Sequence, residues 1–202
     1  MLVLHLVRHG ETAQSAEGVL CGELDPPLTE GGLNQAEVLG KHLATLRPIA
    51  VYASPMLRAR QTAQPLLAGA GLDVHLEYGL REIGYGEWEG RTEGQLREED
   101  PDAYLAWNTD PAVYAPPGGE SGYAIAARAL PVVDRIRLAH KEGHVVIVSH
   151  KATIRVITCA LLGLHVGRFR DRIACPTASL TTFEYGARGP MLVRIGQVYH
   201  GA

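Results

Sequence analysis

The sequence predicts an α/β sandwich with a mostly parallel sheet, and two observations favour this fold. Short apolar runs alternate with segments of helical periodicity along most of the 202 residues, an order of elements that produces parallel sheets covered by helices. One run, residues 145–149, is almost entirely apolar, as expected for a strand buried on both faces. The chain length suits a single compact domain spanning residues 1–202.

The first part of the chain predicts three strands and two helices. Thr29 precedes an amphipathic run and is the expected N-cap of the first helix, and Pro48 lies just past its end. Pro55 stands in or near the first turn of the second helix. The predicted strands are 2–7, 49–53 and 74–77, and the predicted helices are 29–46 and 55–68.

The segment 78–120 differs in composition from the rest of the chain. It holds both tryptophans, Trp88 and Trp107, and a turn-rich stretch at 116–119. We expect short helices at 92–99 and 101–108. The segment is therefore predicted to form a small helical excursion, or cap, beside the main sheet, with Trp107 in a local core.

The last part of the chain predicts a helix, a buried strand, a second helix and a hairpin. Pro131 should break or kink the long helix, because proline removes a helical hydrogen bond. The hairpin leaves one exposed edge, where the sequence allows a homodimer contact. The predicted bounds are 121–141 and 151–162 for the helices, 145–149 for the strand, and 178–185 with 191–198 for the hairpin joined by 186–189.

Composition excludes several classes of protein. Nineteen Lys and Arg residues against 22 Asp and Glu residues give a net charge of -3, which offers no overall attraction to nucleic acid or to a membrane surface. No run reaches the ~18 apolar residues of a membrane span. Cys21, Cys159 and Cys175 stand far apart without a Cys-x-x-Cys pair, which argues against disulfides or zinc and favours the reducing cytoplasm.

The histidine spacings give no supported metal-ligand pattern, so the sequence predicts no metal and no other cofactor. Most of the nine histidines are expected to be ordinary surface or half-buried residues. These are His42, His75, His140, His144, His165 and His200.

Three polar segments follow predicted strands: Arg8-His9-Gly10, Ser54 to Arg58, and Ser149-His150-Lys151. Ligands of parallel sheets bind beyond the carboxyl ends of the strands, so we expect these segments to meet in one site. Arginine presents a planar fork of donors that suits phosphate or carboxylate. Glycine lets a ligand or the backbone come close.

The same residues also have simpler interpretations. Arg8 and His9 alone could be a surface pair, and Arg58 a solvated helix residue that shares a face with Thr62. Lys151 could be a solvent-exposed lysine at a helix start, or it could contact a substrate carboxylate or second phosphate. A helix start itself favours anions, so the N-terminus after His150 is also a candidate anion site.

Six motifs in order along the chain resemble the histidine phosphatase superfamily, which includes cofactor-dependent phosphoglycerate mutase. The resemblance implies a three-layer α/β/α sandwich with a mostly parallel central sheet. The motifs are Leu6-Val7-Arg8-His9-Gly10-Glu11-Thr12, Gly22-x-x-Asp25-x-Pro27-Leu28-Thr29-x-x-Gly32, Ser54-x-x-x-Arg58-x-x-x-Thr62-Ala63, Glu82-x-x-x-Gly86-x-x-Glu89-Gly90, Pro117-Gly118-Gly119-Glu120-Ser121 and Val148-Ser149-His150.

The resemblance also implies roles for five residues. His9 would be the nucleophile that becomes phosphohistidine, and it must be unprotonated to attack. Arg8, Arg58 and His150 would surround the phosphoryl oxygens and stabilise their charge without a metal. Glu82 would protonate the leaving oxygen and then deprotonate the attacking water.

The chain departs from the family pattern at two pocket positions. Ser15 stands where an asparagine is frequent, and Cys21 stands where a serine or threonine frequently precedes the glycine, here Gly22. We expect Ser15, Cys21, Gly22 and Lys151 as additional substrate contacts. Glu11 and Thr12 are expected to support the loop rather than to bind the substrate.

The loop after Glu82 is acidic, whereas mutases of the family carry a basic segment there. The resemblance therefore predicts a metal-independent phosphatase that hydrolyses small anionic phosphomonoesters. Two alternatives remain at this point: a cofactor-dependent phosphoglycerate mutase and a non-catalytic binder of phosphorylated ligands. The presence of all five implied catalytic residues argues against the binder.

Overall fold

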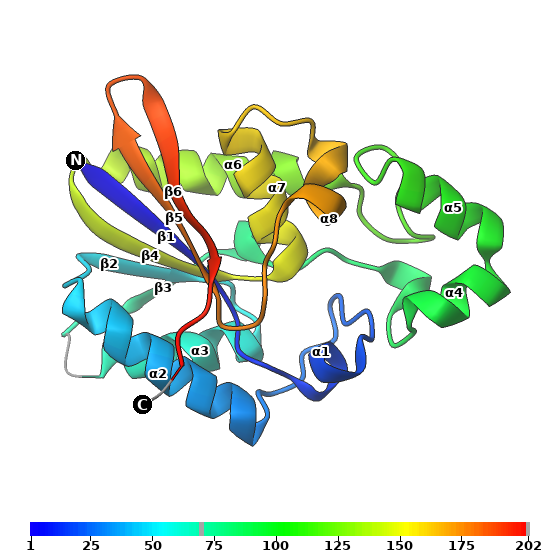
Figure 1. The fold of residues 1–202 in the computed structure, drawn as a ribbon, viewed down its shortest axis with the longest axis horizontal. Helices are drawn as coiled ribbons and strands as arrows, with labels where there is room; N and C mark the ends of the chain where they lie inside the picture. Colours follow the sequence, from blue (N-terminus) through cyan, green and yellow to red (C-terminus); the bar gives the residue numbers. More distant parts are fainter. Residues whose placement is uncertain (69–70, 201–202) are drawn as a thin grey trace.

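A six-stranded sheet forms the centre of the computed structural model, which describes residues 1–68 and 71–200 (Figure 1). The strand order is β3-β2-β4-β1-β5-β6. The two remaining pairs of residues, 69–70 and 201–202, fall within the predicted domain but outside the described residues. The strands are β1 (Leu2–Arg8), β2 (Ala50–Ala53), β3 (Val74–Leu76), β4 (Gly143–Ser149), β5 (Leu180–Gly186) and β6 (Gly189–Gln197).

Four strands of the sheet run parallel, which confirms the predicted mostly parallel arrangement. β4 pairs in parallel with both β1 and β2, and β2 pairs in parallel with β3. β5 and β6 form the predicted hairpin, and β5 pairs antiparallel to β1. The hairpin closes between Gly186 and Gly189, so residues 187–188 make the turn.

Helices cover both faces of the sheet, which confirms the three-layer sandwich (Figure 1). Apolar residues of α6 and α7 pack on one face, and those of α2 and α3 pack on the other. Thr29 caps α2 as predicted, because its side chain accepts a hydrogen bond from the Gly32 amide. The helices are α1 (Ala13–Glu17), α2 (Glu30–Thr45), α3 (Leu57–Leu67), α4 (Glu93–Glu99), α5 (Pro101–Thr109), α6 (Gly122–Ala139), α7 (Lys151–Leu161) and α8 (Phe169–Arg172).

The helix is not broken at Pro131, because α6 continues through this residue. Pro131 lies on the exposed side of α6, and so does Ala127, whose carbonyl would otherwise accept the missing hydrogen bond. Water can therefore satisfy that carbonyl. On the opposite side, Ala129 and Val133 pack into the core on either side of the proline and stabilise the helix across it.

Short helical segments were not predicted from the sequence. They include α1, α8 and the 3-10 turn Val166–Arg168. Segments of three to five residues are too short to show a helical period. α1 is instead defined by its ends, where Thr12 forms a capping box with Ser15 and Gly18 adopts a left-handed conformation.

The excursion 78–120 lies to one side of the sheet and carries α4 and α5 (Figure 1). It has its own apolar cluster, in which Trp107 is 1% exposed and packs edge-on against Trp88. Tyr104, Leu96 and Leu20 complete this cluster. The two tryptophans therefore belong to a local core, as the sequence predicted for Trp107.

Six histidines expected to be ordinary are indeed half-buried or exposed. His5 is different, because it is 2% exposed within the central strand β1. Its Nδ1 atom lies 3.2 Å from the Thr182 hydroxyl and its Nε2 atom lies 2.9 Å from Nδ1 of His144. Burial, followed by the charges of His144, Arg194 and His42, lowers the pKa of His5 to about 4. The folded state therefore holds His5 in its neutral form.

We expect His5 to make the fold sensitive to acid. Its pKa is lower in the folded state than in the unfolded chain, so the unfolded chain binds the extra proton between about pH 6.5 and 4. Stability is then lost as the pH falls through this window, by roughly 3 kcal/mol. Urea unfolding at pH 7 and pH 4.5 should show a smaller loss for His5→Val than for the wild type. An unchanged loss, matching that of the exposed-residue control His75→Val, would contradict this assignment.

None of the helices in the described part of the chain has the length and apolar character needed to cross a membrane.

Candidate active site

The three predicted polar segments meet at the carboxyl ends of β1, β4 and β2. The register pairs Arg8 with Ser149, and the His9 amide donates to the Ser149 carbonyl at 3.0 Å. His9 and His150 therefore stand side by side, with ring centroids 5.1 Å apart. The Ser54 amide donates to the Val148 carbonyl at 2.9 Å, which brings the third segment to the same edge.

His9 is held in one orientation and in a neutral state. Its Nδ1 atom lies 2.7 Å from the Gly10 carbonyl, which assigns the proton to Nδ1 and leaves a lone pair on Nε2. Burial, followed by the charges of Arg8 and Arg58, lowers the pKa of His9 well below its usual value. Burial is the larger of these causes. A neutral Nε2 is the form of histidine that can attack phosphorus.

Gly10 is required by its neighbours rather than by a ligand. A Cβ atom at this position would lie 2.6 Å from the Gly32 carbonyl oxygen, and one on Gly32 would lie 2.1 Å from the Glu11 carbonyl oxygen. The loop after β1 thus packs directly on the backbone at the start of α2. The Gly10 amide donates to Thr62 at 2.9 Å, and Thr62 donates to the Arg58 carbonyl at 2.7 Å.

Arg8 and Arg58 are both anchored to backbone carbonyls. Arg8 donates from Nη1 to the Cys175 carbonyl at 2.7 Å. Arg58 is 1% exposed and donates to the carbonyls of Leu24 at 2.7 Å and Gly22 at 3.1 Å. Within the described residues, the Nε atoms of both arginines are buried and lack a hydrogen-bond partner. The two guanidinium groups are therefore fixed in place beside His9.

His150 is fully buried behind this edge. Its Nε2 atom lies 2.8 Å from the Ser54 hydroxyl. Its Nδ1 atom is buried and has no hydrogen-bond partner in the described part of the chain. Burial and the charge of Arg58 lower the pKa of His150 well below its usual value. His150 thus also carries little positive charge until an anion is bound.

Glu82 occupies the N-terminus of α7, which the sequence analysis considered as an anion site for the ligand. His150 is the N-cap residue but provides no side-chain cap. Instead, the Glu82 carboxylate accepts hydrogen bonds from the amides of Ala152 at 3.1 Å and Thr153 at 3.4 Å. The amides of Ala152 and Thr153 are therefore already used by a carboxylate of this chain rather than left for the ligand.

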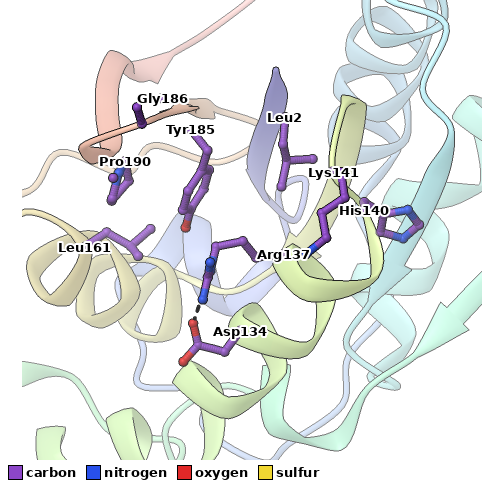
Figure 2. Close-up of a pocket in the computed structure, with 11 residues that line it drawn as sticks. Leu2, Asp134, Arg137, His140, Lys141, Leu161, Tyr185, Gly186 and Pro190 are labelled. Atoms are coloured by element: carbon purple, nitrogen blue, oxygen red, sulfur yellow. Dashed lines mark ion pairs between the residues drawn. The ribbon is translucent and has the colours of Figure 1, made fainter.

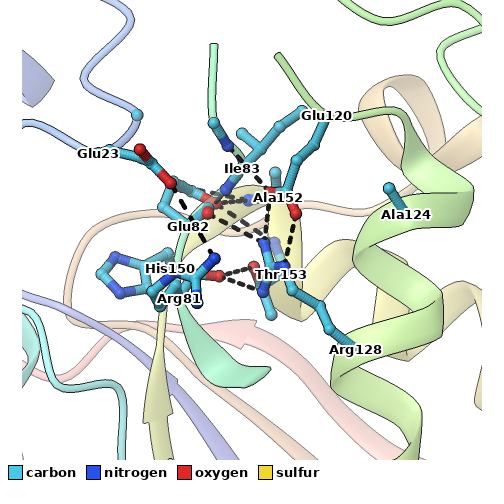
Figure 3. A network of polar contacts seen from close by, with 12 residues as sticks. Glu23, Arg81, Glu82, Ile83, Glu120, Ala124, Arg128, His150, Ala152 and Thr153 are labelled. Atoms are coloured by element: carbon cyan, nitrogen blue, oxygen red, sulfur yellow. Dashed lines mark hydrogen bonds and ion pairs between the residues drawn. The ribbon is translucent and has the colours of Figure 1, made fainter. Parts of the chain in front are cut away.

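Arg128 of α6 holds the segment that carries Glu82 (Figure 3). Its guanidinium donates to the carbonyls of Gly79, Arg81 and Glu82 at 2.8 to 3.0 Å. It also forms a two-point pair with Glu120, whose carboxylate accepts from the Gly84 amide at 3.0 Å. Glu120, from the Pro117-Gly118-Gly119-Glu120 motif, therefore helps to position Glu82 indirectly, because it holds the Arg128 guanidinium.

We expect Arg128→Met to impair acid catalysis rather than all steps equally. The substitution removes every donor that ties the Glu82 segment to α6, so Glu82 loses its fixed position. Hydrolysis of an alkyl phosphate should fall by about 10- to 100-fold, and that of an aryl phosphate by much less. Steady-state kinetics on both esters tests this. Equal losses on both would assign Arg128 a purely structural role, and Arg135→Met on the exposed part of α6 is the matched control.

Ser15, Cys21 and Gly22 all line the pocket beside His9, but two of them are engaged elsewhere. The Ser15 hydroxyl donates to the Thr12 carbonyl at 2.9 Å and accepts from the Thr12 amide. Ser15 thus lines the pocket while its hydroxyl is bonded to the Thr12 backbone. The Cys21 thiol points to the Leu24 carbonyl at 3.3 Å. Gly22 has a φ of 54°, and a Cβ there would overlap Glu89.

One pocket of about 110 Å³ gathers nearly all the predicted site residues. His150 lies behind His9 and is not in its lining. A larger cavity of about 550 Å³ lies near the start of β1 and the turn of the hairpin, and it holds none of them (Figure 2). The predicted residues that line the smaller pocket are Arg8, His9, Ser15, Cys21, Gly22, Arg58, Glu82 and Lys151.

Several residues around the site were not identified from the sequence. Glu93 lines the same pocket, and the sequence analysis gave it no role. Arg128 could have been found only from the fold, because its contacts with the Glu82 segment are to backbone carbonyls. Arg155 had a usable signal, since it lies four residues after Lys151 on one helix face. In residues 1–68 and 71–200, no group of three or more His, Cys, Asp or Glu side chains is placed to hold a metal ion.

Comparison with known proteins agrees with this geometry. Phosphoserine phosphatase 1 of Hydrogenobacter thermophilus is 30% identical over 99% of this chain and 94% of its own length. A glucosyl-3-phosphoglycerate phosphatase of Mycolicibacterium vanbaalenii is 36% identical over 81% of this chain and 75% of its own. A solved mycobacterial glucosyl-3-phosphoglycerate phosphatase with VO3 superimposes with a TM-score of 0.87 at 33% identity, covering 96% of this chain and 98% of that one.

The family model described as histidine phosphatase superfamily (branch 1) matches residues 4–198. The match covers most of β1, all of the other five strands and each of the six motifs that carried the resemblance. This chain therefore belongs to branch 1 of the histidine phosphatase superfamily.

Proposed function

We propose that residues 1–202 act as one phosphatase domain that hydrolyses small anionic phosphomonoesters through a phosphohistidine on His9. One observation carries the proposal. His9 is buried and neutral, its Nδ1 atom is tied to the Gly10 carbonyl, and it lines one pocket with two fixed arginines. A neutral imidazole beside two guanidinium groups is suited to attack on a phosphoryl dianion.

The first step forms the phosphoenzyme. Nε2 of His9 attacks phosphorus while the bond from phosphorus to the ester oxygen breaks. Protonated Glu82 gives its proton to the departing oxygen, so an alcohol leaves. In the second step Glu82 takes a proton from water, the resulting oxygen attacks phosphorus, and the bond to Nε2 breaks. Orthophosphate is released and Glu82 is protonated again.

Arg8, Arg58 and His150 would stabilise the charge of the transferring group. Each of these three residues has a buried nitrogen without a hydrogen-bond partner among the described residues, namely Nε of both arginines and Nδ1 of His150. A buried donor without an acceptor is costly, by about 1–3 kcal/mol. A phosphoryl oxygen near them would offset that cost, which favours a bound anion over an empty pocket.

The relatives support a phosphatase over a mutase. The curated relatives reported above are a phosphoserine phosphatase and a glucosyl-3-phosphoglycerate phosphatase, and each acts on a small phosphorylated compound by its name. The loop that follows Glu82 also lacks the basic segment of the mutases. The other alternative is a non-catalytic binder of phosphorylated ligands. It would be favoured if the protein hydrolysed no ester.

We also propose a cytoplasmic location and a homodimer. Cys159 and Cys175 are buried free thiols, which suits a reducing compartment. Strand β6 is the edge of the sheet and exposes Met191, Val193 and Ile195. An exposed apolar edge is a ready contact for a second copy. A sedimentation measurement would show a mass of one chain, 21.8 kDa, if the dimer proposal is wrong.

The proposed activity is tested by hydrolysis of a panel of phosphomonoesters in excess chelator. We expect orthophosphate release that survives chelation, with brief labelling of the protein by a radioactive phosphoryl donor. Activity that needs an added metal ion would contradict the mechanism. Transfer of the phosphoryl group to a phosphoglycerate instead of water would favour the mutase.

A further inference from the structure

A second cavity of about 350 Å³ lies next to the pocket beside His9. The two share Leu20, Tyr85, Glu93 and Lys151 in their linings. Arg155 lines the second cavity only. A substrate whose phosphoryl group lies beside His9 can therefore place the rest of its structure in this second cavity. The residues around it decide which alcohol is accepted.

Lys151 and Arg155 are the two cations of the second cavity that have no carboxylate partner. The cavity also contains Arg170, which pairs with Glu93 at 2.6 Å, and Arg168, which pairs with Asp171. Among the described residues, Lys151 and Arg155 form no ion pair, and the buried Nε of Arg155 has no hydrogen-bond partner. The two pairs neutralise four charges, and two positive charges remain.

The positions of these cations on α7 set where a ligand anion would lie. Lys151 and Arg155 are four residues apart, so they project from one face of the helix about one turn from each other. Two like charges at this spacing repel each other in the absence of an anion. Burial and neighbouring cations lower the pKa of Lys151, and burial lowers that of Arg155. A bound anion would reduce the repulsion between the two cations and would favour their charged forms.

We propose that Lys151 and Arg155 form a second anion subsite, which selects phosphomonoesters whose alcohol part carries a carboxylate or a second phosphate. The inference rests on the proposed function, because it assumes that the phosphoryl group lies beside His9. Arg155 supplies a planar fork suited to a carboxylate or phosphate, and Lys151 supplies a charge at the junction of the two cavities. Arg170 over the Trp107 ring, 3.7 Å from its centroid, closes the far wall.

The test uses two esters with the same phosphate and the same carbon skeleton. 3-Phosphoglycerate carries a carboxylate where glycerol 3-phosphate carries a neutral hydroxymethyl group. The measured quantity is the ratio of their kcat/KM values. We expect the wild type to favour 3-phosphoglycerate, and each of Lys151→Met and Arg155→Met to lower the ratio by about tenfold or more. Arg155→Lys keeps the charge and should lose less.

Arg172→Met is the matched control, because Arg172 is an exposed cation of the neighbouring helix α8 that lines neither cavity. Its ratio should equal that of the wild type. Glycerol 1,3-bisphosphate separates the two kinds of anion, since a preference for it over 3-phosphoglycerate would name phosphate as the group that the subsite recognises. Equal ratios in the wild type, Lys151→Met and Arg155→Met would overturn the proposal.

Binding measured by calorimetry separates this proposal from the proposed function. On a His9→Ala background no turnover is expected, so affinities for 3-phosphoglycerate and glycerol 3-phosphate can be compared directly. The affinity ratio should fall on adding Arg155→Met. If neither ester is hydrolysed by the wild type but the affinity ratio still falls, the subsite stands and the proposed reaction does not. If both esters are hydrolysed and the affinity ratio is unchanged, the reaction stands and the subsite does not.

Discussion

His9→Ala should abolish phosphomonoester hydrolysis, with a loss of roughly a thousandfold or more in kcat. The substitution removes the atom that forms the bond to phosphorus. None of the neighbouring residues can replace this atom. The two arginines remain charged, and His150 lies behind His9 with its Nε2 atom bonded to the Ser54 hydroxyl. Release of orthophosphate and labelling of the protein by a radioactive phosphoryl donor should both disappear.

The matched control is His144→Ala, which removes another histidine of the sheet from a place outside the pocket. This variant should keep both turnover and labelling. A His9→Ala protein with activity within about tenfold of the wild type would show that the nucleophile is misassigned. Loss of labelling with turnover retained would instead indicate direct attack by water.

Glu82→Gln should slow esters of poor leaving groups far more than esters of good ones. An alkyl oxygen must be protonated as it departs, whereas an aryl oxygen departs well without a proton. We expect a loss of about 100-fold or more on an alkyl phosphate and less than about tenfold on para-nitrophenyl phosphate. The glutamine keeps an oxygen that can accept from the Ala152 amide, so the cap of α7 is retained.

Glu87→Gln provides the comparison, since Glu87 is an exposed carboxylate of the same loop. It should leave the rates on both esters unchanged. Rates of Glu82→Gln that fall by the same factor on both esters would mean that Glu82 only supports α7. A thermal unfolding curve of this variant tells whether any common loss comes from the fold.

The sequence was sufficient for the main features of the fold and for the location of the site. β1 and β4 are continuous apolar runs, and each is followed by a histidine. Parallel strands end at one edge, so the meeting of His9 and His150 follows from the order of elements alone. Arg58 was placed at the same edge by the strand before it. These predictions required only local patterns and the topology of a parallel sheet.

The contacts that fix the site could not be predicted in this way. Glu82 caps a helix 70 residues further along the chain, and no local pattern encodes such a distant cap. Arg128 holds the Glu82 segment through backbone carbonyls, which every residue carries, so these contacts leave no trace in the sequence. His5 lies within an apolar run, and only the packing of α2 and β5 on β1 explains its burial. Pro131 failed as a helix breaker because its exposed side leaves the freed carbonyl to water.

The anchoring of both arginines to backbone carbonyls has a consequence for the end of the reaction. Arg8 is fixed by the Cys175 carbonyl, and Arg58 by the carbonyls of Gly22 and Leu24. Such a cradle needs little rearrangement to receive a tetrahedral dianion, and orthophosphate offers it the same oxygens as the ester does. We therefore expect the alcohol to leave first and orthophosphate to dissociate slowly. Free orthophosphate would then act as a competitive product inhibitor, and its concentration would determine the rate of hydrolysis.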